Sequence, residues 1–344
     1  MTDNLVATVS GKQRTYLVPF SEELVTLWRE AIERTPYTPG PVGGPEYVTT
    51  PKNALDRVLV FQSGDLVIPL LKRRTTHFGI VGADSYEGVQ TNSFLGVASL
   101  DDSVFNSLEA LPLKADIILH VPTPLYEQAK RRLEEHHFYP LRSFSYYKVM
   151  LPGTYDEWFK RHEVSRSEIR KAIRGGVTIA IGGEEYLDDF YRMYLLSFQR
   201  WQDQSKANWH HEYDRFKRMF AIPDSGTKIA IAYSGCRTIA TALICCYRRH
   251  AAALYGGFDY EYRAIKPSNL LYAEVMRYLI ENGCEEYNMG TSNDMPEVDR
   301  FKRSLGGKEY KSVILCRHRF RRLGAFVGLF RSRRRPGDDS EENQ

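Results

Sequence analysis

One helix start in the second half of the chain carries residues suited to binding an anionic group. The segment Arg263-Ala-Ile-Lys-Pro-Ser-Asn269 opens a helix that we expect to run to Asn282. Its proline lies near the first turn, where a missing N–H loses no hydrogen bond. Unpaired amides and a positive partial charge are available there, and Arg263, Lys266, Ser268 and Asn269 add charged and polar side chains that would suit a phosphate-bearing donor. The alternative is that these residues simply begin a helix.

A second basic feature precedes this helix. Arg166, Arg170 and Arg174 recur every four residues in segment 165–174, which ends at Gly175-Gly176. The spacing predicts an amphipathic helix with Ile169 and Ile173 on one face and the arginines on another. The arginine face could bind an anionic acceptor, donor phosphates or tRNA, and a solvated surface is an equally good interpretation.

The elements that would position these residues follow in the order strand, strand, helix, strand. A hairpin around Ser234-Gly235 leads into strand 238–247, and a second strand spans 251–257 and contains Tyr255-Gly-Gly. The helix to Asn282 comes next, and strand 285–290 closes the series. The glycine of the hairpin supplies the positive φ that a tight turn needs.

The same hairpin pattern occurs in the first half. Segment 58–71 and segment 229–244 both read as a strand, a Ser-Gly turn and a strand, and 147–151 corresponds to 310–315 at a similar distance. Helices near 22–34, 102–111 and 124–136 and a strand at 116–121 complete the first half. The sequence therefore predicts two units of mixed α/β structure, an α+β mixed sheet in each, covering 1–151 and 152–316.

Composition sets limits on the class of protein. The 344 residues are 42% hydrophobic with a net charge of +4, and no apolar run is long enough to span a bilayer. The N-terminus lacks the features of a secretory signal, which favours a cytoplasmic protein. The five cysteines show no metal-binding spacing, so we expect no metal and mostly reduced core or strand residues.

The charge is concentrated beyond Cys316. Eight arginines against four carboxylates give this tail the net +4 of the whole chain. Apolar residues recur on one helical side between the arginines, so segment 317–335 fits either a disordered basic tail or a surface segment on an anionic membrane. The rest of the chain is close to neutral, which argues against a broad nucleic-acid-binding face.

Several segments together resemble the FemAB family and the related BioF2-like acyltransferases of the GNAT superfamily. The resemblance covers about residues 150–315 and rests on the arginine helix, Tyr255-Gly-Gly before the helix opened by Pro267-Ser268, Tyr287-Asn-Met-Gly290 and, most specifically, Phe301-Lys-Arg-Ser-Leu-Gly306. Members of the family transfer an acyl or aminoacyl group to an amine, often in cell-wall or surface-polysaccharide assembly. Some use aminoacyl-tRNA in place of coenzyme A.

The resemblance implies tandem GNAT-like domains, the first degenerate, with a catalytic role for Lys302. A fixed cation there could stabilise a phosphate or the oxyanion of acyl transfer, and a solvated lysine is the alternative. It also implies that the donor is bound by Tyr255, Arg263, Lys266, Ser268 and Asn269, with Arg166 and Arg170 nearby. One departure concerns the donor: both glycines of the GNAT pyrophosphate loop are absent, and Pro267 removes one amide.

No catalytic base can be assigned from the sequence. Asp259, Glu261 and Asp294 follow strands, and His210-His211 is expected to be a surface pair. No Ser/His/Asp or Cys/His set indicates covalent catalysis, so direct transfer is expected.

We therefore expect transfer from acyl-CoA to an amine of a cell-envelope or polysaccharide precursor, in the cytoplasm or at the inner face of the membrane. Aminoacyl transfer from aminoacyl-tRNA, as in FemX, is the first alternative, and a non-catalytic binding module with decayed domains is the second.

Overall fold

The computed structural model describes residues 5–8, 14–19, 23–35, 58–77, 80–88, 92–109, 115–203, 210–221, 226–292 and 295–318. The strands of these residues form one mixed sheet of 13 strands, so the expected α/β class with mixed pairing is confirmed. The Pro/Gly-rich loop near 36–45, Asp294 and the tail beyond His318 lie outside the described residues.

The first half begins with strands and one helix and then alternates. Its elements are β1 (Leu5–Thr8), β2 (Arg14–Pro19), α1 (Glu23–Arg34), β3 (Val58–Ser63), β4 (Leu66–His77), β5 (Ile80–Gly88), α3 (Asp102–Glu109), β6 (Asp116–Pro122), α4 (Thr123–Glu135) and β7 (Tyr139–Met150). The hairpin predicted in this half is confirmed, and Gly64 at its turn has a φ of 57°.

The second half repeats the series with extra helices. Its elements are α5 (Tyr155–Arg161), α6 (Glu163–Arg174), β8 (Val177–Gly182), η3 (Glu184–Tyr186), α7 (Leu187–Asp203), α8 (Tyr213–Ala221), β9 (Thr227–Ser234), β10 (Arg237–Tyr247), β11 (His250–Phe258), η4 (Tyr260–Ile265), α9 (Pro267–Glu281), β12 (Glu286–Gly290), α10 (Pro296–Ser304) and β13 (Lys308–Arg317). Gly235 at the second hairpin turn has a φ of 59°, as predicted.

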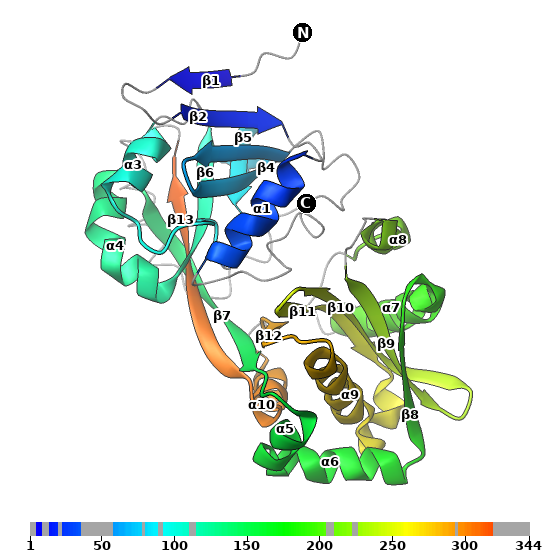
Figure 1. The fold of residues 1–344 in the computed structure, drawn as a ribbon. Helices are drawn as coiled ribbons and strands as arrows, with labels where there is room; N and C mark the ends of the chain where they lie inside the picture. Colours follow the sequence, from blue (N-terminus) through cyan, green and yellow to red (C-terminus); the bar gives the residue numbers. More distant parts are fainter. Residues whose placement is uncertain are drawn as a thin grey trace.

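Apart from β1 at one edge, the strand order is symmetric about the centre of the sheet. It runs β1-β2-β3-β4-β5-β6-β13-β7-β12-β11-β10-β9-β8, so β2 to β6 on one side match β8 to β12 on the other. The last strand of each half is exchanged, because β13 pairs with β6 of the first half and β7 pairs with β12 of the second. Figure 1 shows β7 and β13 running together between the two halves.

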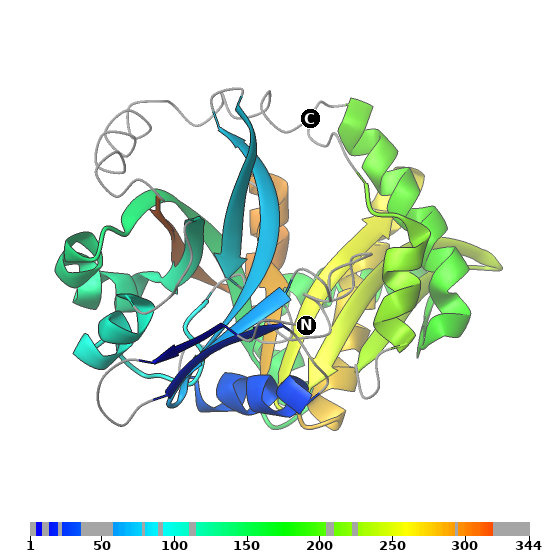
Figure 2. The same ribbon diagram turned by 90° about the horizontal axis from the view of Figure 1, so that it is seen from above.

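Helices cover the two faces of the second half-sheet. The apolar side of α9 packs with α5 and α6 on one face, and Leu271, Val275, Met276 and Leu279 are all buried as predicted. Helices α7 and α8 pack on the opposite face through Leu187, Phe190 and Phe216. Seen from above, α3 and α4 lie on the outer flank of the first half and α7 and α8 on the outer flank of the second (Figure 2).

One detail of α6 differs from the expectation. Ile169 is buried with 2% of its surface exposed, but Ile173 is 57% exposed, and Ala172 takes the inward position instead. A helix turns about 100° per residue, so the inward stripe passes through 165, 169 and 172 and leaves 173 at its edge.

Candidate functional site

The parallel strands β11 and β12 separate partway along their length. They pair only between His250–Ala252 and Glu286–Asn288. Beyond that point β11 continues to Phe258 alongside β10, while β12 stays with β7. The strands therefore diverge toward their carboxyl ends and toward the first turn of α9. We call the space between them the strand gap.

Two glycines let helices approach β11 from both faces. A Cβ on Gly257 would lie 2.5 Å from the Met193 carbonyl oxygen of α7, so only glycine fits there without a backbone shift. A Cβ on Gly256 would lie 3.3 Å from the Tyr272 hydroxyl oxygen of α9. The Tyr255-Gly-Gly segment thus places α7 against one face of β11 and a tyrosine hydroxyl against the other.

The start of α9 has fewer free backbone amides for binding an anion than an ordinary helix start. Lys266 precedes the helix with a φ of 57°, and Pro267 at the first position has no N–H. The Asn269 N–H donates to the Lys266 carbonyl at 3.1 Å, which leaves the Ser268 N–H for a ligand. Lys266 Nζ lies 3.3 Å from Glu168 Oε2, and the Arg263 guanidinium stacks 4.5 Å from the centroid of Tyr260. The predicted donor residues 263–269 are therefore together, with part of their charge already paired.

Tyr255 does not join this group. Its ring packs with α7 and α8, on the sheet face opposite α9. The register of β10 and β11 shifts between Leu243 and Ile244, which pair with Tyr255 and Ala253, so Leu254 is an extra residue in a β-bulge. The bulge interrupts the alternation of side chains and turns Tyr255 to the other face.

Lys302 is buried next to the end of β12. Its side-chain amino group donates to the Gly290 carbonyl at 3.0 Å and to the Thr291 carbonyl at 2.6 Å, and 7% of the residue is exposed. Burial lowers the pKa of Lys302 to about 8, partly offset by the nearby Asp299 carboxylate. An ammonium group has three donors, so one N–H remains beyond the two carbonyls.

The turn after α10 holds Lys302 in place. Gly306 has a φ of 90°, and a Cβ there would lie 2.5 Å from the His162 ring. Trp158 Nε1 donates to the Leu305 carbonyl at 3.2 Å, and Ser165 Oγ donates to the Ser304 carbonyl at 2.6 Å. These contacts satisfy carbonyls at the helix end. The positive φ of Gly306 and its close approach to His162 explain why the Phe-Lys-x-x-x-Gly segment needs its glycine.

Asp299 is a polar neighbour of Lys302 that the sequence analysis missed. Hydrogen bonds from Ser292 and Tyr147 hold the pKa of Asp299 below its usual value. The Tyr147 ring lies 5.9 Å from Lys302 Nζ. A carboxylate one turn before Lys302 on the same helix was visible in the sequence, but its partners come from distant segments.

The arginines of α6 lie away from the start of α9. Glu168, which binds Lys266, lies roughly 160° around the helix from Arg166 and Arg170. Arg166, Ser167, Arg170 and Arg174 line a surface hollow of about 420 Å³. Arg166 and Arg170 therefore lie on a different side of α6 from the contact with Lys266 and form a separate basic surface.

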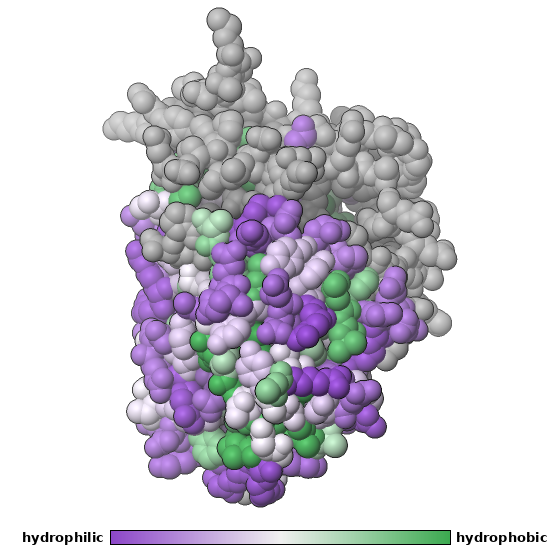
Figure 3. Space-filling view, turned by 90° about the vertical axis from the view of Figure 1, so that its right-hand side faces the viewer, coloured by the Kyte–Doolittle hydropathy of each residue, from purple (hydrophilic) through white to green (hydrophobic). Residues whose placement is uncertain are grey.

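A larger hollow of about 690 Å³ lies along the outer side of α7. Its lining includes Tyr191, Leu196, Tyr213, Arg237 and Asp259. Figure 3 views the molecule from the side of α7 and β8 and shows apolar patches between hydrophilic residues. Asp259, considered above as a base, accepts from Arg237 at 2.8 Å and from the Glu261 N–H at 3.1 Å, so its carboxylate is already engaged.

His211 is half-buried and packs against aromatic rings, so it is less exposed than the expected surface pair implies. Its Nε2 lies 2.9 Å from the Tyr255 hydroxyl, and its ring packs edge-on against Tyr255 and Phe216. Burial lowers the pKa of His211 to about 4, with help from the charge of Arg215. The histidine is therefore neutral near pH 7, and only the aromatic pattern of the following helix hinted at its burial.

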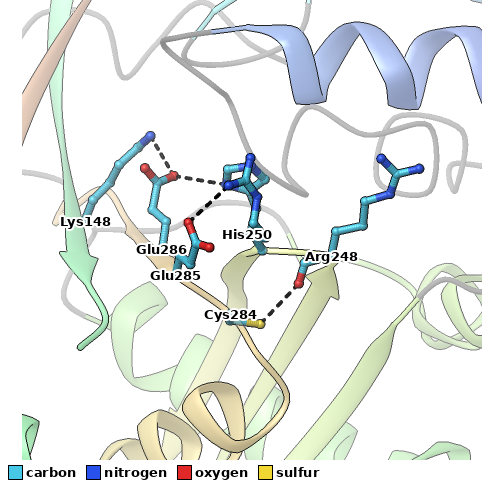
Figure 4. A network of polar contacts seen from close by, with 7 residues as sticks. Lys148, Arg248, His250, Cys284, Glu285 and Glu286 are labelled. Carbon is cyan, nitrogen blue, oxygen red and sulfur yellow. Dashed lines mark hydrogen bonds and ion pairs between the residues drawn. The ribbon is translucent and has the colours of Figure 1, made fainter. Parts of the chain in front are cut away.

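A buried ionic network joins the starts of β11 and β12 to β7 (Figure 4). Lys148 Nζ lies 2.9 Å from Glu286 Oε1, and His250 Nδ1 lies 3.9 Å from the same oxygen. Lys148 also faces the Tyr146 and Tyr310 rings at 5.7 and 5.6 Å. The network lies where β12 meets the exchanged strands, at the end of β12 opposite to Lys302.

In the described part of the chain, no group of three or more acidic, histidine or cysteine residues is arranged to hold a metal ion. No helix among the described residues has the length and hydropathy needed to span a membrane.

Comparisons with known proteins support this fold. Residues 160–312 match the family described as "Acetyltransferase (GNAT) domain". The fold is similar to the crystal structure of FemX, with a TM-score of 0.68 at 12% identity over 91% of this chain and 99% of that one. L-PGS from Bacillus licheniformis gives a TM-score of 0.53 at 13% identity over 92% and 98% of the two chains.

A tandem GNAT protein from the clavulanic acid biosynthesis pathway, solved without AcCoA, gives a TM-score of 0.50 at 11% identity over 90% of this chain and 99% of that one. No curated protein sequence matches the chain. Residues 160–312 therefore match a GNAT acetyltransferase domain, and the fold of the described residues consists of two GNAT-like halves.

Proposed function

We propose that the C-terminal half transfers an acyl group from acyl-CoA to an amine by direct attack. The observation that carries this proposal is the strand gap, which opens beyond Ala252 and Asn288 toward the start of α9. Such a gap can accept an extended acyl carrier, because backbone groups of separated strands are available to bind it. The Ser268 N–H, Arg263 and Lys266 would receive the phosphates at the mouth of the gap.

In the proposed reaction the acceptor nitrogen attacks the acyl carbon, the bond from carbon to the thioester sulfur breaks, and an amide and a thiol result. Negative charge develops on the carbonyl oxygen during the attack. We assign Lys302 to this oxyanion, because its ammonium group is buried, is fixed by two carbonyls and retains one donor. A pKa of about 8 leaves most of the population charged at pH 7.

A second candidate donor is aminoacyl-tRNA. It is favoured by the start of α9, where Pro267 and the paired Asn269 N–H leave a single amide for a pyrophosphate. The basic hollow formed by Arg166, Arg170 and Arg174 could bind a nucleic-acid backbone. A non-catalytic binding module is the third possibility, and it would bind a ligand without turnover.

For the acceptor, we propose an amine of a cell-envelope or polysaccharide precursor. This choice rests on the resemblance of the sequence to the FemAB family. Arg317 ends β13 and is buried, so we propose that the remainder of segment 317–335, which lies outside the described residues after His318, holds the enzyme at an anionic membrane. Flotation with anionic and neutral liposomes, using the full chain and a chain ending at His318, tests this: selective loss of anionic binding supports it.

Calorimetry and turnover with acetyl-CoA, longer acyl-CoAs and charged tRNA test the donor. The proposal expects binding and amide formation with at least one acyl-CoA. Turnover with charged tRNA alone would select the second candidate, and binding without turnover would select the third. Failure of every donor to bind at millimolar concentration would refute the proposed function.

A further inference from the structure

Asp299 lies on the same side of α10 as Lys302, one helical turn earlier. The Lys302 ammonium group donates to two neutral acceptors, the Gly290 and Thr291 carbonyl oxygens, and only 7% of the residue is exposed. Neutral carbonyls fix the group in place but bring no negative charge, so burial favours the uncharged amine. The Asp299 carboxylate opposes this effect, because its charge raises the pKa of Lys302.

Two hydroxyl groups hold the Asp299 carboxylate. Ser292, just beyond β12, and Tyr147 of β7 donate hydrogen bonds to it. The Tyr147 side chain is buried, and its ring lies 5.9 Å from Lys302 Nζ. The Arg303 guanidinium donates to the Tyr147 hydroxyl oxygen at 3.1 Å, which leaves the hydroxyl proton for the carboxylate. These contacts fix the carboxylate and keep it ionised, because hydrogen bonds to a carboxylate favour its charged form.

The outer part of this network comes from the exchanged strands. Arg303 Nη2 lies 2.7 Å from Glu309 Oε2 of β13, and Ser145 Oγ of β7 donates to Glu309 Oε1 at 2.6 Å. Strand β7 ends the first half of the chain and pairs with β13 beside α10. The carboxylate next to Lys302 is therefore held in part by a tyrosine that the first half contributes.

A carboxylate in a first helical turn can also serve the helix alone. Glu297 and Asp299 both lie in the first turn of α10, where negative charge interacts favourably with the unpaired amides. Glu297 is exposed, whereas Asp299 Oδ1 is buried without a hydrogen-bond partner among the described residues. A buried carboxylate oxygen is unfavourable unless nearby cations compensate it, and Lys302 and Arg303 do so by lowering the pKa of Asp299. The placement of Asp299 thus follows from its charged neighbours as well as from the helix start.

We propose that Asp299 is the positioning residue that keeps Lys302 charged at the site of acyl transfer. This inference rests on the proposed function and adds the source of the charge on which the oxyanion role depends. With the carboxylate present, the pKa of Lys302 is about 8, and the ammonium form predominates at pH 7. Without the carboxylate the pKa of Lys302 would fall further. The uncharged amine, which cannot stabilise an oxyanion as a cation does, would then form near neutral pH.

The test compares Asp299→Asn with Asp299→Glu, which restores the charge, and with Glu297→Gln, which removes the other first-turn carboxylate of α10. NMR of the full chain with isotope-labelled lysine side chains follows the Lys302 signal with pH, and Lys302→Arg identifies that signal. The wild-type midpoint is expected near pH 8. In Asp299→Asn it should move down by about one pH unit, which is a tenfold change in proton affinity. Asp299→Glu should recover most of the shift, and Glu297→Gln should keep the wild-type midpoint.

The pH dependence of kcat gives a second readout. The ratio of kcat in Asp299→Asn to kcat in the wild type cancels the titration of the acceptor amine, which both enzymes share. This ratio should be about 1 at pH 6 and fall to about 0.1 above pH 8. A loss that came from structural damage alone would lower the ratio equally at every pH.

Three results would overturn the assignment: an unshifted Lys302 midpoint in Asp299→Asn, an equal shift in Glu297→Gln, or a kcat ratio that does not change with pH. If Asp299→Asn does not fold, Tyr147→Phe replaces it. That variant keeps the ring and removes one hydrogen bond to the carboxylate, so the midpoint should move the same way by a smaller amount, and no movement would overturn the assignment. A wild-type chain that turns over no donor would refute the proposed function alone, because the titration of Lys302 requires no donor.

Discussion

The two halves of the molecule contain the same series of strands. The space beyond the parallel strand pair is open in the second half and filled in the first. In the second half, β11 continues six residues beyond its last contact with β12, at Ala252, and the gap stays open. In the first half, β5 ends at Gly88, one residue beyond its last contact with β6, at Glu87. Segment 92–95 then occupies the space that corresponds to the strand gap of the second half.

The filling segment bonds to both neighbouring strands. Ser93 N donates to the His120 carbonyl at 2.7 Å, and Leu95 and Val67 exchange two backbone hydrogen bonds at 3.0 Å. Asn92, Ser93, Phe94 and Leu95 are at most 1% exposed. A donor could not enter here without displacing a packed segment, which favours the expectation that the first half binds no donor.

The first half still contributes to the second. It supplies β7 as the neighbour of β12, and α1 reaches across so that the Arg29 guanidinium lies 5.3 Å from the Tyr247 ring at the end of β10. The closed copy thus acts as support for the open one. Three substitutions test this division of roles, and a fourth tests the pH dependence of stability.

The largest effect is expected from Lys302→Ala. Losing a fixed cation at a developing oxyanion should lower kcat about 100- to 1,000-fold, as the loss of a single oxyanion donor does. Steady-state kinetics with the active donor measures it. Arg300→Ala is the matched control, because Arg300 is an exposed cation on the same helix α10. Equal activity of wild type and Lys302→Ala would remove the lysine from the site and leave the enzyme class intact.

Filling the strand gap of the second half should make it resemble the first half, where a packed segment occupies the corresponding space. Gly256→Val would place methyl groups at the Tyr272 hydroxyl, only 3.3 Å from the new Cβ. We expect donor affinity to fall roughly 10-fold, a loss of about 1.4 kcal/mol, because the valine side chain would occupy space that the donor needs. Calorimetry measures the affinity, and circular dichroism checks the fold. A folded variant with wild-type affinity would show that the donor binds elsewhere.

Removing a hydrogen bond from segment 92–95, which fills this space in the first half, should lower stability without changing activity. Ser93→Ala removes the Oγ that accepts from the His120 N–H at 2.8 Å in a fully buried setting. The unsatisfied amide should lower the free energy of unfolding by about 1–3 kcal/mol, read from the urea midpoint, while donor affinity and kcat stay unchanged. A loss of activity without a loss of stability would give the first half a direct role in catalysis.

The smallest effect concerns pH. The pKa of His211 is lowered to about 4 in the folded chain, mainly by burial, against about 6.5 when unfolded. The unfolded chain therefore binds the proton first, and stability falls as pH drops from about 6.5 toward 4. His211→Gln should remove roughly 1 kcal/mol of the loss between pH 7 and pH 5. Identical pH dependence in the variant would show that His211 protonates freely when folded.

Local sequence predicted much of this fold. The Ser-Gly hairpins, the α9 core stripe and the strand order after it follow from turn chemistry and side-chain periodicity, which act over a few residues. The correspondence between 147–151 and 310–315 was also visible. The pairing of these two segments with each other could not be predicted, because the sequence of a strand does not determine which distant strand it pairs with. The exchange of β7 and β13 depends on the whole sheet.

The candidate site was predictable only in part. Residues 263–269 are contiguous, so their shared position follows from one helix start. Tyr255 was expected there as well, but the bulge at Leu254 shifts its side chain to the face of α7, and a bulge has no fixed sequence signature. Asp299 gains its importance from neighbours that the fold brings together, which no short motif encodes.

The stoichiometry of donor binding tests the central claim most directly. Isothermal calorimetry of the full chain with an acyl-CoA or a non-hydrolysable analogue should give one site per chain, and that site should weaken in Gly256→Val and persist in Ser93→Ala. Two sites per chain, or one site that survives Gly256→Val and is lost in Ser93→Ala, would contradict the assignment of the open gap as the donor site.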